Sequence, residues 1–193
     1  MVALTDVQHL DLALLSSLLN VEALYFLIYS YIFGSTIYVS FIGGTIAFKA
    51  LPRQQFGTLQ AKSWPVHFGT TLVLDLVLLG LWTSSHPDVA SAISDVKHVD
   101  VAQAHALILI ALCSALNLFV VGPYTAKVWL ERFRLQREEQ SDEDKNLQVS
   151  PELKALNIRF GYMHAVSASV NLGVLISLIF HGLWIATYGV EKY

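Results

Sequence analysis

An acidic residue in the middle of an apolar segment is the first feature of this sequence with chemical consequences. Asp75 lies about ten residues into the apolar segment 65–83. An ionised carboxylate near the centre of a bilayer costs at least about 2.5 to 3.5 kcal/mol, so Asp75 must be protonated, paired or hydrated. His67 and Thr71 precede it at four-residue spacing and share its helical stripe. The stripe indicates either a proton or cation site, or a protonated Asp75 that is hydrogen-bonded to Asn171 or a tyrosine as a structural contact.

Two pairs of histidines suggest a second kind of site. His67 and His164 lie near one end of the expected spans, and His105 and His181 lie near the other. Haem iron needs two coordinating side chains from facing helices, so these pairs are compatible with one or two haems b. His164 and His181 of the last span are about 25 Å apart along the helix and about 100° apart around it, so one haem face cannot serve both. Buried histidines held by hydrogen bonds are the alternative.

Membrane-spanning helices are needed to position these residues, and the composition of the chain predicts such helices. The chain has 193 residues, of which 54% are hydrophobic and 14% charged, and its mean hydropathy is +0.53. We expect an all-α membrane protein, a four-transmembrane-helix bundle that forms a single domain over residues 1–193. The expected elements are a short surface helix from Leu4 to Leu18 and spans at about 23–48, 65–83, 102–121 and 160–188.

The basic residues predict the orientation of these spans. Of twelve Lys and Arg, three fall between the first two spans and seven between the last two. By the positive-inside rule, loops 49–64 and 122–159 are cytosolic and both termini are lumenal or extracellular. We expect a short interfacial helix from Pro52 to the pair Trp64-Pro65 in the first loop. The second loop is expected to form a protruding helical hairpin, with the fourth helix beginning at Ser150-Pro151-Glu152.

Small residues repeat every four positions in two of the spans. Lipid gives helices no hydrophobic reason to associate, so close packing depends on small residues that let backbones approach. One ladder is in the first span and the other in the fourth, where it lies roughly opposite a polar stripe of His164, Ser167 and Asn171. The fourth span is therefore either central in the bundle or packed against a second protomer or another protein. The ladders are Thr36, Ser40 and Gly44, and Ala165, Ser169, Gly173 and Ser177.

Charge and cysteine content exclude several classes of protein. A net charge of -3 provides no basic field for a polyanion, so we expect no nucleic-acid partner. The single cysteine, Cys113, excludes an internal disulfide framework and a multi-cysteine metal cage. Copper(I) or platinum handling would favour thiolate and thioether ligands, of which the chain has few. The sequence contains no serine-histidine-acid arrangement, phosphate loop or metalloprotease motif.

Residues 33–68 carry a resemblance to a known family. The segment resembles the transmembrane-protein-205-like family, which is also described as a domain of unknown function. The matching residues there are Gly34, Val39-Ser40-Phe41, Gly43, Phe48, Leu51-Pro52-Arg53, Phe56-Gly57, Gln60, Lys62, Pro65 and Phe68. Later matches are Asn117 followed six residues on by Pro123, and His164, Ser167 and Asn171-Leu172-Gly173.

The resemblance implies a small four-helix integral membrane protein of the endoplasmic reticulum or the plasma membrane. It is similar to family members linked to cellular resistance to platinum drugs, and it implies no established chemistry. A remote likeness to the copper-resistance-D and membrane haem-protein group keeps haem possible, although His105, His181 and Asp75 lie outside the matched motifs. The motif emphasises Arg53, Gln60, Lys62, Asn117, His164 and Asn171, so a site would open towards the cytosolic half.

We therefore expect a non-enzymatic polytopic membrane protein, transport-related or an accessory subunit of a membrane assembly. Its partners would be membrane lipid and either another membrane protein or a second copy, and no cofactor is expected. The alternatives are a haem b-binding redox protein using His164 and His67, or a proton- or cation-coupled transporter using Asp75. The candidate polar cluster is Asp75, His67, Asn117, His164, Ser167 and Asn171. The family-motif loop is Pro52, Arg53, Gln60 and Lys62, and the packing residues are Ser40, Gly44, Ser169, Gly173 and Ser177.

Overall fold

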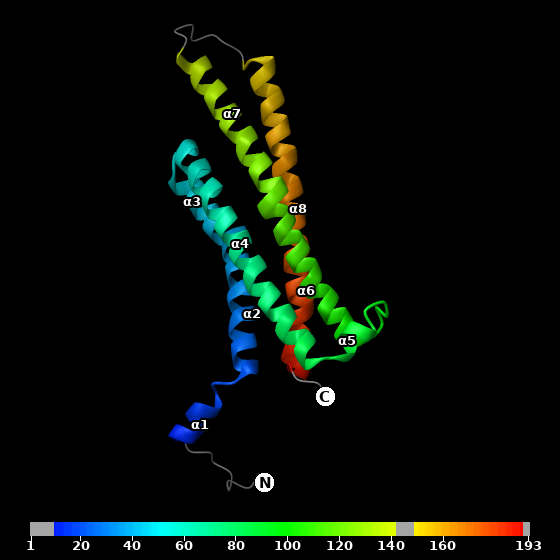
Figure 1. The fold of residues 1–193 in the computed structure, drawn as a ribbon. Coiled ribbons are helices and arrows are strands. Elements are labelled where there is room, and N and C mark those ends of the chain that lie inside the picture. The colour runs from blue at the N-terminus through cyan, green and yellow to red at the C-terminus, as the bar shows by residue number, and fades with distance from the viewer. Residues whose placement is uncertain (1–9, 142–148, 191–193) are drawn as a thin grey trace, which may run out of the picture.

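The computed structural model describes residues 10–141 and 149–190, and within them every regular element is a helix. The expected all-α membrane class is confirmed, because four helical segments in these ranges are long and apolar enough to cross a membrane. They run side by side as an elongated bundle (Figure 1). The segments are Val21–Ala50, Arg53–Ser85, Val99–Glu139 and Pro151–Tyr188.

The short α1 helix (Leu12–Ser17) precedes the bundle and lies apart from it (Figure 1). It begins after Asp11, whose side chain accepts a hydrogen bond of 2.7 Å from the backbone N–H of Leu14. The expected surface helix from Leu4 to Leu18 falls partly outside the described residues. Its described part contains α1, whose leucine side chains are largely exposed.

The first span consists of α2 (Val21–Ile37), the π-helical turn η1 (Tyr38–Gly43) and α3 (Gly44–Ala50). The side chain of Asn20 caps α2 by accepting a hydrogen bond of 2.7 Å from the N–H of Ala23. Asn20 and Glu22 supply the cap and acidic first turn that favour a helix start. The span is continuous across η1.

The separate interfacial helix expected in loop 49–64 is wrong. The second span, α4 (Arg53–Ser85), begins directly after Pro52 and continues through Pro65 without a break. Proline removes one backbone hydrogen bond, but membrane helices tolerate it because neighbouring groups compensate. Trp64 stacks on Phe68 at 5.2 Å between ring centroids, which packs the turn around the proline. The connection between the first two spans is therefore only Leu51 and Pro52.

The third span also continues where a loop was expected to begin. It comprises α6 (Val99–Leu116), the π-helical turn η2 (Asn117–Val121) and α7 (Gly122–Ser141). The N–H of Gly122 bonds to the carbonyl oxygen of Asn117, and this wider turn accommodates Pro123, which has no N–H. A Cβ at position 122 would lie 2.5 Å from that oxygen, so glycine is required there. The helix expected after Pro123 is therefore present, but it continues from the third span without a break.

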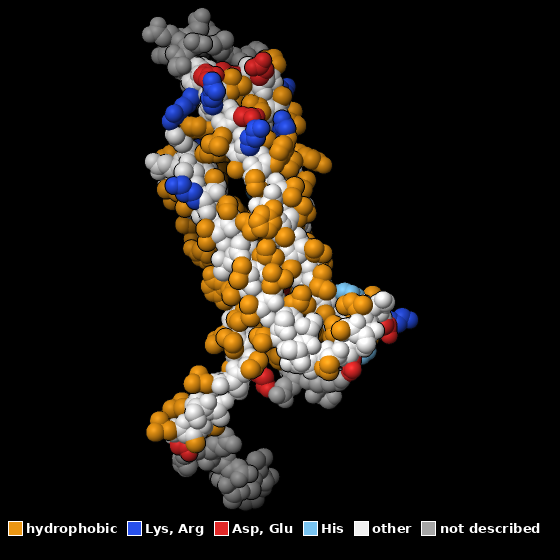
Figure 2. All heavy atoms as spheres, in the orientation of Figure 1, with side chains coloured by type: hydrophobic (Ala, Val, Ile, Leu, Met, Phe, Trp, Pro, Cys, Tyr) orange, Lys and Arg blue, Asp and Glu red, His pale blue; other side chains and the backbone are white. Residues whose placement is uncertain are grey.

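The fourth span, α8 (Pro151–Tyr188), begins at the predicted position. Ser150 caps it by accepting a hydrogen bond of 3.0 Å from the N–H of Leu153, and its hydroxyl also bonds to Glu139 of α7. The α7 helix and the first part of α8 pack together and extend beyond the α3–α4 turn as the expected hairpin, which we call the stalk (Figure 1). Lys and Arg side chains gather at this end of the molecule (Figure 2).

The tightly packed core lies at the opposite end of the bundle, which we call the α5 end. The short α5 helix (Asp88–Ser91) lies there between α4 and α6. The α6 helix packs against both α4 and α8, and α2 packs against the same two helices. Large apolar side chains cover the outer surface of the spans, as expected for contact with lipid (Figure 2). The buried cluster includes Tyr25, Ile32, Leu78, Trp82, Val101, Leu107, Ile110, Val174 and Leu178.

Gly182 of α8 provides a test of this packing. A Cβ at this position would overlap the hydroxyl of Tyr29, which donates a hydrogen bond of 2.9 Å to the carbonyl oxygen of Leu178. We expect Gly182→Ala to displace Tyr29 and to lower the free energy of unfolding by about 1–3 kcal/mol. Thermal unfolding in detergent, followed by circular dichroism, measures the change. Gly80→Ala is the control, because a Cβ there meets no atom within 4 Å; equal losses in both variants would contradict the packing.

Candidate functional site

The carboxyl group of Asp75 is buried in the bundle without a partner. Its side chain is 0% exposed, and neither carboxyl oxygen has a hydrogen-bond partner among the described residues. The bond expected from Asn171 is absent, because the amide of Asn171 donates to the hydroxyl of Ser40 at 2.8 Å. The buried tyrosines are also engaged elsewhere: Tyr25 with His181 and Tyr29 with the backbone of α8.

The stripe predicted from spacing on α4 is buried along its length. His67, Thr71 and Asp75, which we call the α4 polar stripe, are all buried. Nε2 of His67 has no hydrogen-bond partner within the described ranges. The His67 ring contacts Trp64 and Phe68 of its own helix. His67 also lines a groove of about 380 Å³ between η1, α3 and α4, together with Gln60. The stripe therefore leads from this groove towards Asp75.

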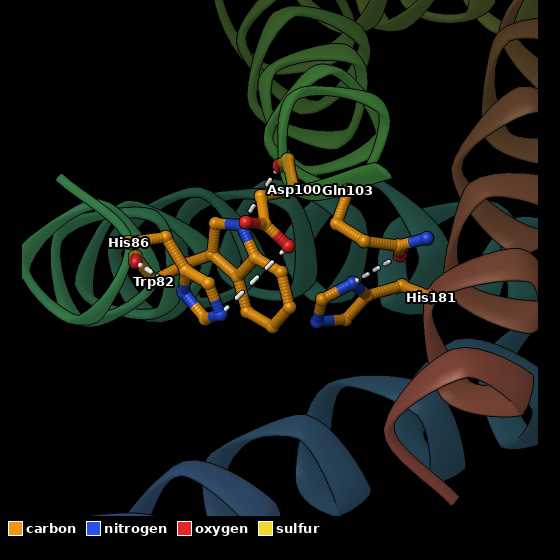
Figure 3. A network of polar contacts seen from close by, with 5 residues as sticks. All are labelled: Trp82, His86, Asp100, Gln103 and His181. Carbon is orange, nitrogen blue, oxygen red and sulfur yellow. Dashed lines mark hydrogen bonds and ion pairs between the residues drawn. The ribbon is translucent and has the colours of Figure 1, made fainter. Parts of the chain in front are cut away.

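His181 belongs to a polar network at the α5 end that the sequence did not predict. Nδ1 of His181 lies 2.9 Å from the amide oxygen of Gln103, and Nε2 lies 2.6 Å from the hydroxyl of Tyr25 (Figure 3 shows the Gln103 contact). An amide oxygen only accepts, so Nδ1 donates to Gln103 and Nε2 of the neutral ring accepts from Tyr25. Both ring nitrogens of His181 are thus occupied, which leaves neither available to ligate haem iron.

Trp82, His86 and Asp100 continue this network beside His181. The indole N–H of Trp82 donates to the carbonyl oxygen of Asp100 at 2.9 Å, and the ring of His86 stacks on Trp82 with centroids 4.0 Å apart. Nε2 of His86 lies 4.0 Å from a carboxyl oxygen of Asp100 (Figure 3). We call Tyr25, Trp82, His86, Asp100, Gln103 and His181 the outer network. The polar residues Asp100 and Gln103 at the start of the third span could have indicated this network.

A layer of hydroxyl groups lies between Asp75 and the stalk. Thr36 on α2 is eleven residues from Tyr25, Thr71 on α4 is eleven from Trp82, and Ser114 on α6 is eleven from Gln103. Eleven residues span about 16 Å along a helix axis. The three residues therefore lie at a common level, about one helical turn from Asp75. All three are buried, and the hydroxyls of Thr36 and Ser114 have no hydrogen-bond partner in the described part of the chain. We call these three residues the hydroxyl layer.

The remaining predicted polar residues form two contacts between helices. Asn117, the first residue of η2, donates to the carbonyl oxygen of Ser167 at 3.3 Å and accepts from its hydroxyl at 2.9 Å. Asn171 bonds to Ser40, which lies in η1. Each contact thus joins a π-helical turn to α8, and such turns occur often at functional sites. The predicted polar cluster is therefore divided among several places rather than gathered in one.

The two proposed haem ligands have different surroundings. His67 is buried on α4 beside the α3 groove, whereas His164 is exposed on α8 and stacks on Phe160 with centroids 6.1 Å apart. The described residues contain no group of three or more His, Cys, Asp or Glu side chains suited to a metal ion. These surroundings do not fit a buried pair of axial ligands, and ligation of haem b stays a prediction.

The small-residue ladders meet different neighbours along their length. A Cβ on Gly44 would lie 3.7 Å from the amide nitrogen of Gln60, so this ladder contacts α4. A Cβ on Gly173 would lie 3.7 Å from the sulfur of Cys113 on α6, and Ser177 is buried. Ser169 is exposed, as is Ala165. The expected contact of this exposed part with a second copy or another membrane protein stays a prediction.

The family-motif loop forms the start of α4. Pro52 precedes the helix and Arg53 is its first residue, and both are exposed. Lys62 is exposed on the same helix, whereas Gln60 is half-buried and lines the groove. The loop thus contributes an exposed basic surface on one side and a polar group of the groove on the other.

The hydrogen bond between Tyr25 and His181 is open to a direct test. We expect Tyr25→Phe to leave Nε2 of His181 without its buried partner and to lower the free energy of unfolding by about 1–3 kcal/mol. Equilibrium unfolding of the detergent-solubilised protein measures the loss. Tyr31→Phe on the same helix is the control, because Tyr31 is exposed. A Tyr25→Phe variant as stable as the control would show that the network contributes nothing to stability.

Comparison with known proteins places the chain in a family. The family described as "Domain of unknown function (DUF4149)" matches residues 27–134, more than half of the chain. Transmembrane protein 205 of Danio rerio is 33% identical over 67 residues, which are 35% of this chain and 36% of that protein. The alignment therefore spans about a third of the relative's length. No solved structure matches. The chain belongs to this family of transmembrane-protein-205-like membrane proteins.

Proposed function

We propose that this protein is a non-enzymatic, transport-related membrane protein in which Asp75 reversibly binds a proton or a small cation. The observation that carries the proposal is the fully buried Asp75 carboxyl group, whose two oxygens have no hydrogen-bond partner among the described residues. Ionisable residues inside membrane spans are expensive and commonly mark ion pathways or proton relays. We prefer ion binding to the other expected roles because it involves Asp75, and helix packing alone does not explain why a carboxyl group is buried there.

The charges around Asp75 support this role. The described residues bury no Lys or Arg side chain in the bundle, so no permanent cation compensates the carboxyl group. The other buried titratable side chains in the core are Tyr25 and Tyr29 on α2, His67 on α4 and His181 on α8, together with His86 and Asp100 in the outer network. Both nitrogens of His181 are already hydrogen-bonded. Asp75 is therefore left to bind a proton or a cation that enters the bundle.

The polarity on the two sides of Asp75 differs, which supports access from the stalk end. Towards the stalk lie the hydroxyl layer and then His67, which lines the groove. Towards the α5 end, Leu78, Leu107 and Leu178 are completely buried between the level of Asp75 and the outer network. Polar groups can hydrate or relay an ion, whereas an aliphatic layer resists it. This difference favours access to Asp75 from the stalk side over access from the other side.

The orientation in the membrane is part of the proposal. The excess of basic residues in the turn between the first two spans and in the stalk favours a cytosolic location for this end. Asp75 would then exchange its proton or cation with the cytosol, in the endoplasmic reticulum or the plasma membrane. Release on the other side would require the aliphatic layer to open.

Substitution of Asp75 tests the proposed function. The full chain is reconstituted into liposomes that contain a dye sensitive to protons, sodium or potassium, and a gradient of the matching ion is imposed in separate experiments. We expect a flux above that of empty liposomes for at least one of these ions. We expect Asp75→Asn, which keeps the shape but removes the titratable group, to reduce this flux to the level of empty liposomes.

Asp95→Asn is the matched control, since Asp95 is exposed in the segment between α5 and α6. It should retain the wild-type flux. An unchanged flux in Asp75→Asn would refute the proposal, and so would a wild-type protein that moves none of the three ions.

A further inference from the structure

Two arginines from different helices lie at a common level where α4 packs against the stalk. Gly57, one turn after the start of α4, packs directly against the indole of Trp129 on α7, because a Cβ at 57 would overlap that ring. The two helices run in opposite directions (Figure 1). Arg53, one turn before Gly57, is therefore brought to the level of Arg132, which is about one turn after Trp129. The positive charges of Arg53 and Arg132 lie close enough to repel each other.

The guanidinium group of Arg132 is held in place but not satisfied. Its Nε atom is buried and has no hydrogen-bond partner within the residues that the structure describes. Its central carbon lies 5.2 Å from the centre of the Phe160 ring of α8, so one face of the group is covered by the ring. A stacked guanidinium still presents its N–H edge, and this edge is the part that binds planar or tetrahedral anions.

The described ranges place no acidic side chain against this arginine pair. The ion pairs found there are Arg134 with Glu138 and His86 with Asp100, neither of which involves Arg53 or Arg132. The first turn of α4 contains no acidic residue. Two cations at close range repel each other, and a shared anion removes this repulsion while adding charge-assisted hydrogen bonds.

We propose that Arg53 and Arg132 form a binding site for a phosphate group, carried either by an anionic lipid headgroup or by a soluble phosphate. Guanidinium groups bind phosphate oxygens in pairs of parallel hydrogen bonds, which favours phosphate among biological anions. The site lies just beyond the charge-free part of the spans, at the end of the bundle where basic residues gather (Figure 2). Anionic headgroups are enriched at such a surface of the cytosolic leaflet. The proposal is independent of ion binding at Asp75.

Calorimetric titration of the full chain in a neutral detergent tests the site. The probes are dioctanoyl phosphatidic acid, dioctanoylglycerol, which is the same lipid without its phosphate, and sodium phosphate, each added separately. We expect phosphatidic acid or phosphate to bind more tightly than dioctanoylglycerol. Arg53→Gln and Arg132→Gln should each weaken this binding at least about tenfold, because each removes charge-assisted hydrogen bonds.

The control variant is Arg134→Gln, which removes the same charge from a neighbouring position on α7. Arg134 is exposed and already paired with Glu138 at 2.8 Å, so we expect its loss to change the affinity less than about twofold. Because Arg53 is exposed at the first position of its helix, Arg53→Gln keeps the test valid if Arg132→Gln disturbs the Phe160 contact.

The probes also distinguish the two sources of phosphate. Binding of phosphatidic acid without binding of sodium phosphate identifies a lipid headgroup site, and binding of both identifies a site for soluble phosphates as well. The proposal is overturned if neither probe binds more tightly than dioctanoylglycerol. It is equally overturned if Arg134→Gln weakens binding as much as Arg53→Gln.

Discussion

An uncompensated carboxyl group in an apolar bundle is the constraint on which the account of this protein depends. Keeping an ionised Asp75 in the middle of a span costs at least about 2.5 to 3.5 kcal/mol, and no buried Lys or Arg in the described chain offsets this. The hydroxyl layer and His67 provide polar surroundings on one side only. Replacing buried charged groups with well-packed apolar side chains is often neutral or stabilising. The retained carboxyl group is the reason that we propose ion binding at Asp75.

The rest of the bundle is built so that helices stay close around this group. Gly182 admits the hydroxyl of Tyr29, and Gly57 admits the ring of Trp129, so two helix pairs are joined by an aromatic side chain set against a glycine. At the two π-helical turns, Asn117 and Ser40 bond to α8. These contacts replace the hydrophobic driving force that lipid does not provide between helices. The Gly182 contact lies towards the α5 end and the Gly57 contact towards the stalk, so helices are held together on both sides of Asp75.

The sequence predicted the fold class, the start of the fourth helix and the buried stripe on α4, because hydropathy, helix caps and four-residue spacing act locally. It failed at Pro65 and at Pro123, where proline suggested the end of a helix. Inside a membrane, a break would expose more backbone groups than the proline itself leaves unpaired, so the helices continue. Partners such as Tyr25 and His181 could not be predicted, because they depend on how the helices are rotated against one another.

The most direct test of the central claim is the state of the Asp75 carboxyl group itself. Infrared difference spectroscopy of the reconstituted protein over a pH titration detects the carbonyl stretching band of a protonated carboxyl group. The account predicts a band that is missing in Asp75→Asn and that appears and disappears reversibly with pH while the protein stays folded. A band assigned to Asp75 that does not change at any pH would identify a permanently protonated structural residue and would contradict a role in ion binding.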